Sequence, residues 1–185
     1  MLIGITGTLG AGKGTIVEIL KNKGFTHYSV REFLIEEIKK RGLPMDRNSM
    51  VLVGNHLREE NSPSYIVEKL YARAKGNGGN SVIESIRAIG EVEALKKKGD
   101  FYLFSVDAEI EKRYSRIKER KLDSDFVSYD KFVSDEKREM ENSDPTKQNL
   151  SECIKMSDFK FMNNGTISDL EKKVEEVLNK IKASF

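Results

Sequence analysis

The sequence is poor in cysteine and has no tryptophan: its 185 residues include one cysteine, Cys153. A single cysteine excludes an internal disulfide and a cysteine-rich metal cluster, because both need several thiols. No apolar run approaches the roughly 18 residues of a membrane span. Gly4 and Gly7 interrupt the first apolar run, which is therefore too short for a signal peptide. These absences favour a cytoplasmic protein outside the membrane.

An excess of one charge is also missing. The chain has 32 Lys+Arg and 30 Asp+Glu, which gives a net charge of +2. This balance argues against a protein that mainly coats nucleic acid, since such proteins carry a strong basic excess. The length and the hydrophobic fraction of 38% are ordinary for one globular domain. We expect a single domain over residues 1–185, either a monomer or a dimer.

Short apolar runs alternate with segments in which apolar residues recur at helical spacing. The runs that predict strands are residues 2–6, 25–30, 81–84, 101–106 and 159–162. Residues 46–74 predict two helices broken at 61–64, where Pro63 suits a first helical turn. Strands that alternate with helices predict an α/β fold, with five parallel strands covered on both faces.

The stretch GTLGAGKGT, residues 7–15, directly follows the first apolar run. Glycines in such a loop let backbone N–H groups approach phosphate oxygens, and the following helix adds its positive N-terminal end. Lys13 would reach the terminal phosphates, and the Thr15 hydroxyl would face a magnesium ion or a phosphate. The residues expected to bind ATP with Mg²⁺ are Leu9, Gly10, Ala11, Gly12, Lys13, Gly14 and Thr15.

Gly14 departs from the usual P-loop pattern, in which Ser or Thr follows the lysine. A glycine in a helical turn costs on the order of 1 kcal/mol relative to alanine. We therefore expect that close approach of a ligand at Gly14 is useful. The dinucleotide pattern G-x-G-x-x-G fits poorly, because Thr15 stands at its third glycine position. The sequence also lacks the Asn-Lys-x-Asp motif of a GTP switch.

With Gly14 included, GAGKGT resembles the loop of adenylate kinase and of other P-loop nucleoside monophosphate kinases. The segment ESIR, residues 84–87, stands where adenylate kinases carry Asp-Gly-Phe-Pro-Arg. This resemblance implies that Glu84 orients magnesium and that Arg87 holds the acceptor phosphate. RYSRIKER, residues 113–120, resembles the R-x-x-x-R pair that opens the lid of these kinases, which implies catalytic roles for Arg116 and Arg120.

The chain is more similar still to a group of short archaeal proteins related to adenylate and dephospho-coenzyme A kinases. The shared features are Glu32, RGL at 41–43, LR at 57–58 and IRAIGEVE at 86–93. The ending NNGT at 163–166 is similar to dephospho-coenzyme A kinase and adds Asn164 to the expected nucleotide contacts. The resemblance covers nearly the whole chain. It implies a P-loop NTPase three-layer sandwich with a helical acceptor-binding insertion at about 30–75 and a short mobile lid at about 121–140.

Two segments differ from adenylate kinases. Where those have Thr-Gly-Asp ahead of an arginine, this chain has SVRE at residues 29–32; a glutamine that reads adenine would fall near Glu91. Adenine in the acceptor site is therefore not supported. The residues expected to contact the acceptor are Ser29, Arg31, Glu32, Arg58 and Arg87. For the residues at 29–32, a helix start with Ser29 near its cap is the alternative explanation.

Two further alternatives stay open. Asp107, directly after the apolar run FYLFSV, fits a magnesium site as well as Glu84 on pattern alone. Arg113 and Arg120 share a helical face with several glutamates, so a solvated, salt-bridged surface is the alternative to catalysis for these two arginines.

These features predict an ATP-dependent phosphotransferase that moves the γ-phosphate of Mg-ATP to a small phosphorylated acceptor, most simply a nucleoside or deoxynucleoside monophosphate. Phosphoryl transfer depends on positioned cations, and arginine pairs with phosphate through two parallel N–H groups. A dephospho-coenzyme A kinase, with Glu32 or Glu84 as the base, is the alternative within this class. An adenylate-kinase-like ATPase that acts as an RNA or protein assembly factor is the alternative of another class.

Overall fold

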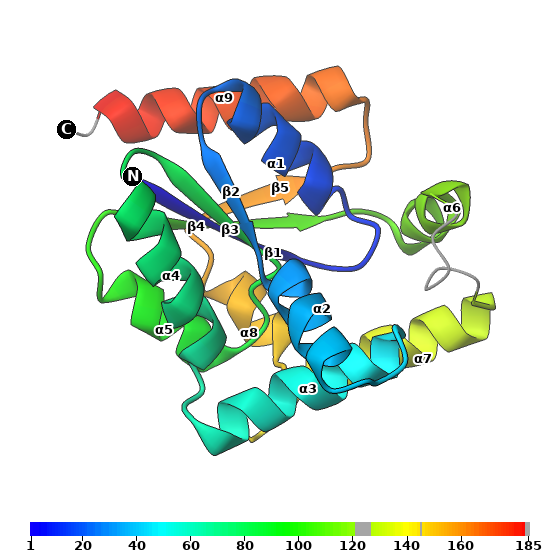
Figure 1. The fold of residues 1–185 in the computed structure, drawn as a ribbon. Helices are drawn as coiled ribbons and strands as arrows, with labels where there is room; N and C mark the ends of the chain where they lie inside the picture. The colour runs from blue at the N-terminus through cyan, green and yellow to red at the C-terminus, as the bar shows by residue number, and fades with distance from the viewer. Residues whose placement is uncertain (121–126, 145, 184–185) are drawn as a thin grey trace.

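The computed structural model describes residues 1–120, 127–144 and 146–183. Within these residues, five parallel strands form one sheet in the order β2-β3-β1-β4-β5 (Figure 1). The strands are β1 (Leu2–Gly7), β2 (Thr26–Ser29), β3 (Ser81–Glu84), β4 (Phe101–Asp107) and β5 (Phe159–Met162). Each of them lies on one of the five predicted segments, so the α/β class with five parallel strands is confirmed.

Helices connect the strands. They are α1 (Lys13–Asn22), α2 (Val30–Lys40), α3 (Arg47–Glu60), α4 (Tyr65–Asn77), α5 (Ile89–Lys96), α6 (Ile110–Arg120), α7 (Tyr129–Met140), α8 (Leu150–Lys155) and α9 (Ile167–Ala183). Helices α2 to α4 stand between β2 and β3, in the segment expected to form the insertion. The short α8, which the apolar pattern does not predict, begins where the Asn149 side chain accepts a hydrogen bond from the backbone N of Glu152.

The two faces of the sheet are covered by separate hydrophobic clusters. Successive side chains of a strand point to opposite faces, so Ile3 of β1 joins one cluster and Leu2 joins the other. The Ile3 cluster includes residues of α1 and α9, and the Leu2 cluster includes residues of α2 to α5 and α8. Figure 1 shows α1 and α9 on one side of the sheet and α4, α5 and α8 on the other, which is the expected three-layer sandwich.

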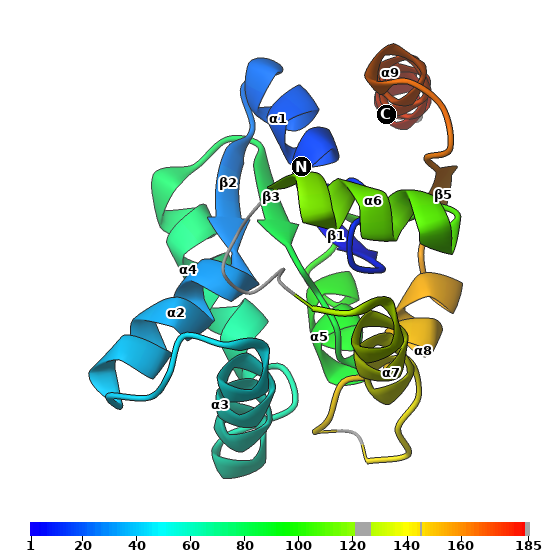
Figure 2. The same ribbon diagram turned by 90° about the vertical axis from the view of Figure 1, so that its right-hand side faces the viewer.

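The carboxyl ends of parallel strands meet at one edge of a sheet, and ligands of open α/β sheets bind there. Figure 2 shows α2, α3, α6 and α7 around this edge. Of the expected lid at about 121–140, residues 121–126 lie outside the described residues, and most of the remainder forms α7. Among the described helices, none is long and apolar enough to cross a membrane.

Candidate functional site

A cavity of about 530 Å³ lies at the carboxyl edge of the sheet, a size typical of small-ligand pockets. The wall formed by the loop after β1, the start of α1 and the loop after β5 is called here the donor wall; it includes Gly10, Gly12, Lys13, Gly14, Thr15 and Asn163. The wall formed by α2, α3, the segment after β3, and α7 is called the acceptor wall; it includes Arg31, Arg47, Met50, Arg58, Arg87 and Glu139. The cavity therefore joins two groups of polar residues that are distant in the sequence.

Lys13 is the buried cation of the donor wall. Its Nζ donates hydrogen bonds to the backbone oxygens of Gly7 and Thr8, at 2.9 and 2.8 Å, and the residue is only 9% exposed. Burial, and next the charge of Arg87, lower the pKa of Lys13 to about 7. A bound anion acts in the opposite direction, because a nearby negative charge favours the protonated amine. Lys13 is thus placed where a polyphosphate would restore its charge.

The N-terminus of α1 is open to an anion. Gly12 is its N-cap residue, with φ at 109°, and no side chain caps the helix. The first N–H groups of a helix have no carbonyl partner within it, so here they are available to phosphate oxygens. No atom lies within 4 Å of the point where a Cβ on Gly14 would stand. This arrangement fits the phosphates of a nucleotide.

Asn163, which the sequence patterns do not single out, packs against the phosphate loop. Its Nδ2 donates to the backbone oxygen of Ala11 at 2.8 Å, and a Cβ on Gly12 would lie only 2.3 Å from this nitrogen. Arg116 Nη2 in turn donates to the backbone oxygen of Asn163 at 3.0 Å. The buried Nη1 of Arg116 has no partner in the described part of the chain. The side chain of Asn163 therefore fixes the position of the loop.

Asn164, the residue expected at the nucleotide, has other contacts. Its Oδ1 accepts from the backbone N of Glu109 at 2.9 Å, and its Nδ2 donates to Glu109 Oε1 at 3.1 Å. Asn164 joins the loop after β5 to the segment that opens α6, while its neighbour Asn163 lines the cavity. A position directly after a predicted strand was the available signal for both residues, and it does not distinguish them.

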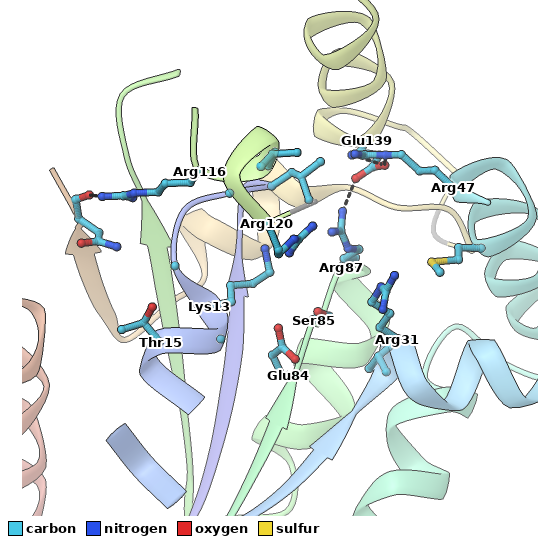
Figure 3. Close-up of a pocket in the computed structure, with 18 of the residues that line it drawn as sticks. Lys13, Thr15, Arg31, Arg47, Glu84, Ser85, Arg87, Arg116, Arg120 and Glu139 are labelled. Carbon is cyan, nitrogen blue, oxygen red and sulfur yellow. Dashed lines mark hydrogen bonds and ion pairs between the residues drawn. The ribbon is translucent and has the colours of Figure 1, made fainter. Parts of the chain in front are cut away.

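The three arginines of α6 have different positions. Arg116 and Arg120 both line the cavity. Figure 3 shows the Arg120 side chain beside Lys13 and the Arg116 side chain directed toward the loop after β5. Arg113 is 5% exposed; it donates to the backbone oxygens of Ala108 and Leu9 at 2.8 and 3.3 Å. The solvated-surface explanation is therefore wrong for Arg113, which joins α6 to the phosphate loop.

Of the two carboxylates considered for magnesium, Glu84 lines the cavity with Thr15. Burial acts to raise the pKa of Glu84, but the neighbouring His27 and Lys13 outweigh it, so this pKa is lowered and the carboxylate is charged. The Nε2 of His27 lies 3.4 Å from Glu84 Oε2. The two atoms are close but are not aligned for a hydrogen bond. Glu84 offers the oxygen chemistry that Mg²⁺ prefers.

One carboxylate oxygen of Asp107 already accepts two hydrogen bonds outside the cavity. Its Oδ1 accepts from Thr8 Oγ1 at 2.5 Å and from the backbone N of Ala108 at 2.8 Å, and it is not part of the cavity lining. Glu84 is thus the better placed of the two. No group of three or more His, Cys, Asp or Glu among the described residues could hold a metal ion by itself.

The acceptor wall is organised around the buried carboxylate of Glu139. Arg87 Nη1 donates to Glu139 Oε2, and Arg47 donates to Oε1 through Nε and Nη2, at 2.8 Å each (Figure 3). Burial acts to raise the pKa of Glu139, but the charges of Arg87 and Arg47 outweigh it, so the pKa is lowered. Sequence patterns single out Arg87, but neither Arg47 nor Glu139. Arg47 and Glu139 occur among many helical charges and carry no local signal.

A strained turn brings Arg87 to the cavity. Ser85 has φ at 72° and is the only non-glycine residue with positive φ in the described part of the chain. The left-handed conformation costs an L-residue about 1–2 kcal/mol. The backbone N–H groups of Ser85 and Ile86 both donate to the oxygen of Ile5, at 3.0 and 3.1 Å, which holds the turn. The segment that carries Arg87 is therefore anchored to β1.

A buried ion pair stands behind this segment. Arg58 is 1% exposed and Glu91 0%; Arg58 Nη2 and Nε donate to Glu91 Oε1 at 2.8 and 3.1 Å. The other oxygen of Glu91 accepts from the backbone N of Arg87 and of Ala88, at 2.9 and 3.1 Å. Glu91 thus positions Arg87. Arg58 also lines the cavity, and its Nη1, like the Oε1 of Gln148, has no partner among the described residues.

At the start of α2, Ser29 Oγ accepts from the backbone N of Glu32 at 3.2 Å, so Ser29 is the N-cap, as the alternative explanation holds. Neither Ser29 nor Glu32 lines the cavity, whereas Arg31 does, and Figure 3 shows it near Arg87. Of the three, Arg31 keeps the geometry of an acceptor contact.

Most of the chain matches a known protein family. The family described as AAA domain matches residues 3–144. The chain belongs to this family. The match extends from β1 through α7, so it includes the phosphate loop, the insertion, and the helices that carry Arg116, Arg120 and Glu139. The matched residues therefore include most of both walls of the cavity, but not Asn163 in the loop after β5.

Full-length relatives carry the name UPF0200 protein. One from Pyrococcus horikoshii is 24% identical over 191 residues and is aligned over all of both chains. Another, from Methanothermobacter thermautotrophicus, is 28% identical over 183 residues, which cover 98% of this chain and 90% of the relative. The chain is thus similar along its whole length to short archaeal proteins.

Solved structures show the same fold. TT1252 from Thermus thermophilus has a TM-score of 0.63 at 18% identity, with 97% of both chains covered. Shikimate kinase from Bacteroides thetaiotaomicron also has a TM-score of 0.63, at 11% identity, with 97% of this chain and 98% of the other covered. Dephospho-CoA kinase from Campylobacter jejuni has 0.52 at 14% identity, with coverage of 97% and 96%. The fold is therefore that of P-loop kinases.

Proposed function

We propose that this AAA domain protein is an ATP-dependent phosphotransferase whose acceptor is a small phosphorylated molecule, in the first place a nucleoside or deoxynucleoside monophosphate. The observation that carries the proposal is the single cavity with an anion-binding donor wall on one side and an arginine-rich acceptor wall on the other. ATP hydrolysis needs only the first of these walls. Transfer between two phosphorylated molecules needs both, facing one another.

In this proposal the donor wall binds the triphosphate of ATP. The N-terminus of α1 and Lys13 hold the phosphates, and Lys13 with Arg120 offsets the charge that develops on the transferring group. Magnesium bound with ATP supplies further positive charge, and Thr15 and Glu84 are the residues that would hold it. Arg116, beside Asn163, would contact the nucleotide at the outer end of the donor wall.

The acceptor wall would hold the second phosphate and read the rest of the acceptor. Arg87 and Arg31 provide the cations, and the apolar lining residues Val30, Leu34, Met50 and Val51 provide a surface for a base. Glu91 has a carboxylate in place of the glutamine amide that reads adenine, and this carboxylate is paired with Arg58. The unpartnered Arg58 Nη1 is a donor, and the Gln148 amide can accept or donate. This pair favours a base with a carbonyl group, such as guanine, uracil or thymine.

A panel of acceptors tests the proposal. Purified protein with Mg-ATP is offered ribonucleoside and deoxynucleoside monophosphates and dephospho-coenzyme A, while ADP and the phosphorylated product are both quantified; Lys13→Ala is the blank. We expect stoichiometric ADP and product with an oxo-base monophosphate. Product from dephospho-coenzyme A alone would keep the reaction class and replace the acceptor. ATP hydrolysis without any phosphorylated product, stimulated by an RNA or protein partner, would replace the kinase by the assembly-factor ATPase.

A further inference from the structure

We propose that the Glu139 carboxylate occupies the binding site of the acceptor's phosphate, and that a phosphate monoester binds between Arg87 and Arg47 by displacing it. Displacement separates α7 from Arg87 and Arg47, while Glu136 keeps it attached to Arg113 on the donor side. The identity of the anion as an acceptor group rests on the proposed function, whereas the exchange of a carboxylate for a phosphate does not.

The first support is the way in which the two arginines share one carboxylate. Arg87 and Arg47 come from different elements, and each donates to a different oxygen of Glu139. The planar fork of arginine matches carboxylate and phosphate oxygens equally well. A phosphate monoester has three terminal oxygens and a charge of about −1.5 to −2, against two oxygens and −1 for the carboxylate. The same pair of arginines would therefore bind a phosphate more strongly than it binds Glu139.

The second support is the charge around the cavity. Arg87 and Arg47 share the single negative charge of Glu139, and Arg31 and Glu84 also line the cavity. The charges of the two arginines disfavour the protonated amine of Lys13, whereas those of Glu84 and Glu139 favour it. Two arginines are therefore matched by one carboxylate at the point where they meet. Glu139 lowers the free-energy cost of holding the two partly buried arginines there, and a dianion would compensate their charge more fully.

The third support is the other acidic contact of α7. Glu136 lies three residues before Glu139, so both face the same side of the helix. Glu136 accepts hydrogen bonds from both terminal nitrogens of Arg113, and the distance from Nη2 to Oε1 is 2.9 Å. Arg113 Nη1 also donates to the backbone oxygen of Leu9 in the phosphate loop, at 3.3 Å. One carboxylate of α7 thus contacts the arginines of the acceptor wall and the other contacts the donor side. Loss of the Glu139 contact would leave α7 held by Glu136 and by Arg138, whose Nη1 donates to Asn48 Oδ1 of α3 at 3.2 Å, and would couple acceptor binding to the phosphate loop.

A purely structural ion pair makes the opposite prediction. If Glu139 only orients the two arginines, Glu139→Gln disorders them and weakens anion binding. If Glu139 occupies the phosphate site, the same substitution removes a competing charge and strengthens anion binding. The glutamine has nearly the same shape, so the two explanations differ in the sign of the change.

Inorganic phosphate is the probe, and isothermal titration calorimetry measures its affinity. All variants carry Lys13→Ala, so that the donor wall contributes less to the signal. We expect Glu139→Gln to tighten phosphate binding by about tenfold, the usual effect of a hydrogen-bonded charge. Adding Arg47→Gln should abolish this gain. Glu136→Gln, which removes an equal charge from the same helix face, should change the affinity by less than about threefold. Thermal unfolding shows whether each variant is folded.

A second measurement uses the protein without substitutions. Hydrogen exchange at the backbone amides of residues 136–140 should become faster when phosphate is added, because the Glu139 contact is lost. Weaker or unchanged phosphate binding in folded Glu139→Gln, or slower exchange in α7, would overturn the proposal. Neither measurement involves phosphoryl transfer. A failed acceptor panel therefore leaves this result readable, and a successful panel does not guarantee it.

Discussion

The donor wall and the acceptor wall are built in opposite ways. The donor wall comes largely from one stretch, residues 7–15, in which a buried strand, a glycine loop and a helix follow one another. The charged residues of the acceptor wall come from four places: α2, α3, the segment after β3, and α7. Phosphate recognition at the donor wall is therefore a local property of the chain, whereas recognition at the acceptor wall depends on how distant helices pack.

The cations of the two walls also differ in what holds them. Lys13 is held by neutral backbone oxygens, and its burial, together with the charge of Arg87, lowers its pKa to about 7. Arg87 and Arg47 are held by the charged carboxylate of Glu139. A nucleotide therefore finds a donor cation that has no ion pair among the described residues. An acceptor must compete with a counter-ion that is already in place.

The largest effect is expected at Lys13. Lys13→Ala removes the cation from the donor wall, and we expect transfer to fall by about 10²–10³-fold, as for the loss of one group that stabilises developing charge. The fold should be retained, because Lys13 donates only to the loop oxygens of Gly7 and Thr8. The turnover number with a saturating acceptor measures the loss, and thermal unfolding is the control. Near-normal turnover would remove the donor wall from the proposed reaction.

A smaller and more selective effect is expected at Arg87. Arg87→Ala should lower kcat/KM for the acceptor by about 10–100-fold, the usual cost of hydrogen bonds to a charged group. The Kd of ATP should change by less than about threefold, because the phosphate loop is intact. Arg87→Lys is the matched control: it keeps the charge but not the fork, so it should recover only part of the loss. An unchanged acceptor KM and kcat would contradict the division between the two walls.

The third effect is a pH dependence confined to the donor wall. Because the pKa of Lys13 is lowered to about 7, a growing share of the free protein has a neutral amine as the pH rises above 7. Bound phosphates favour the charged amine, so ATP binding takes up a proton and weakens with rising pH, by up to about tenfold per unit above pH 7. Calorimetry in two buffers of different ionisation enthalpy counts the protons.

Lys13→Arg is the control for this prediction, since an arginine stays charged and takes up no proton. The arginines of the acceptor wall stay charged over this range, so phosphate binding there should follow only the second ionisation of the phosphate itself. ATP binding without proton uptake would mean that Lys13 is already charged in the free protein.

The difference between the walls also explains how far the sequence could be interpreted. The strands, the sheet class and the phosphate loop depend on local periodicity and glycine spacing, and the structure has them where they were predicted. Arg87 could be found because it lies shortly after a predicted strand, in the segment that resembles the acceptor site of adenylate kinases. Arg47 and Glu139 could not, because nothing near either residue shows that their helices meet. For the same reason the sequence does not decide whether Arg113 lies on a solvated surface or in the site. In the structure Arg113 is buried against the phosphate loop.

Gly14 gives the smallest effect and the finest test of the donor wall. The structure leaves open space where a Cβ on Gly14 would stand, so Gly14→Ala should raise the free energy of unfolding by at most about 1 kcal/mol. In a chain of this size that corresponds to a rise in Tm of about 2–4 °C. If a ligand approaches closely there, the same methyl group should weaken ATP binding by a few-fold.

Gly14→Ser, which restores the hydroxyl of the usual loop pattern, separates the loss of space from the lack of an oxygen ligand. A more stable protein with unchanged ATP affinity in both variants would show that this glycine is not kept for close approach, and that the donor wall tolerates a side chain at the position where its sequence is most unusual.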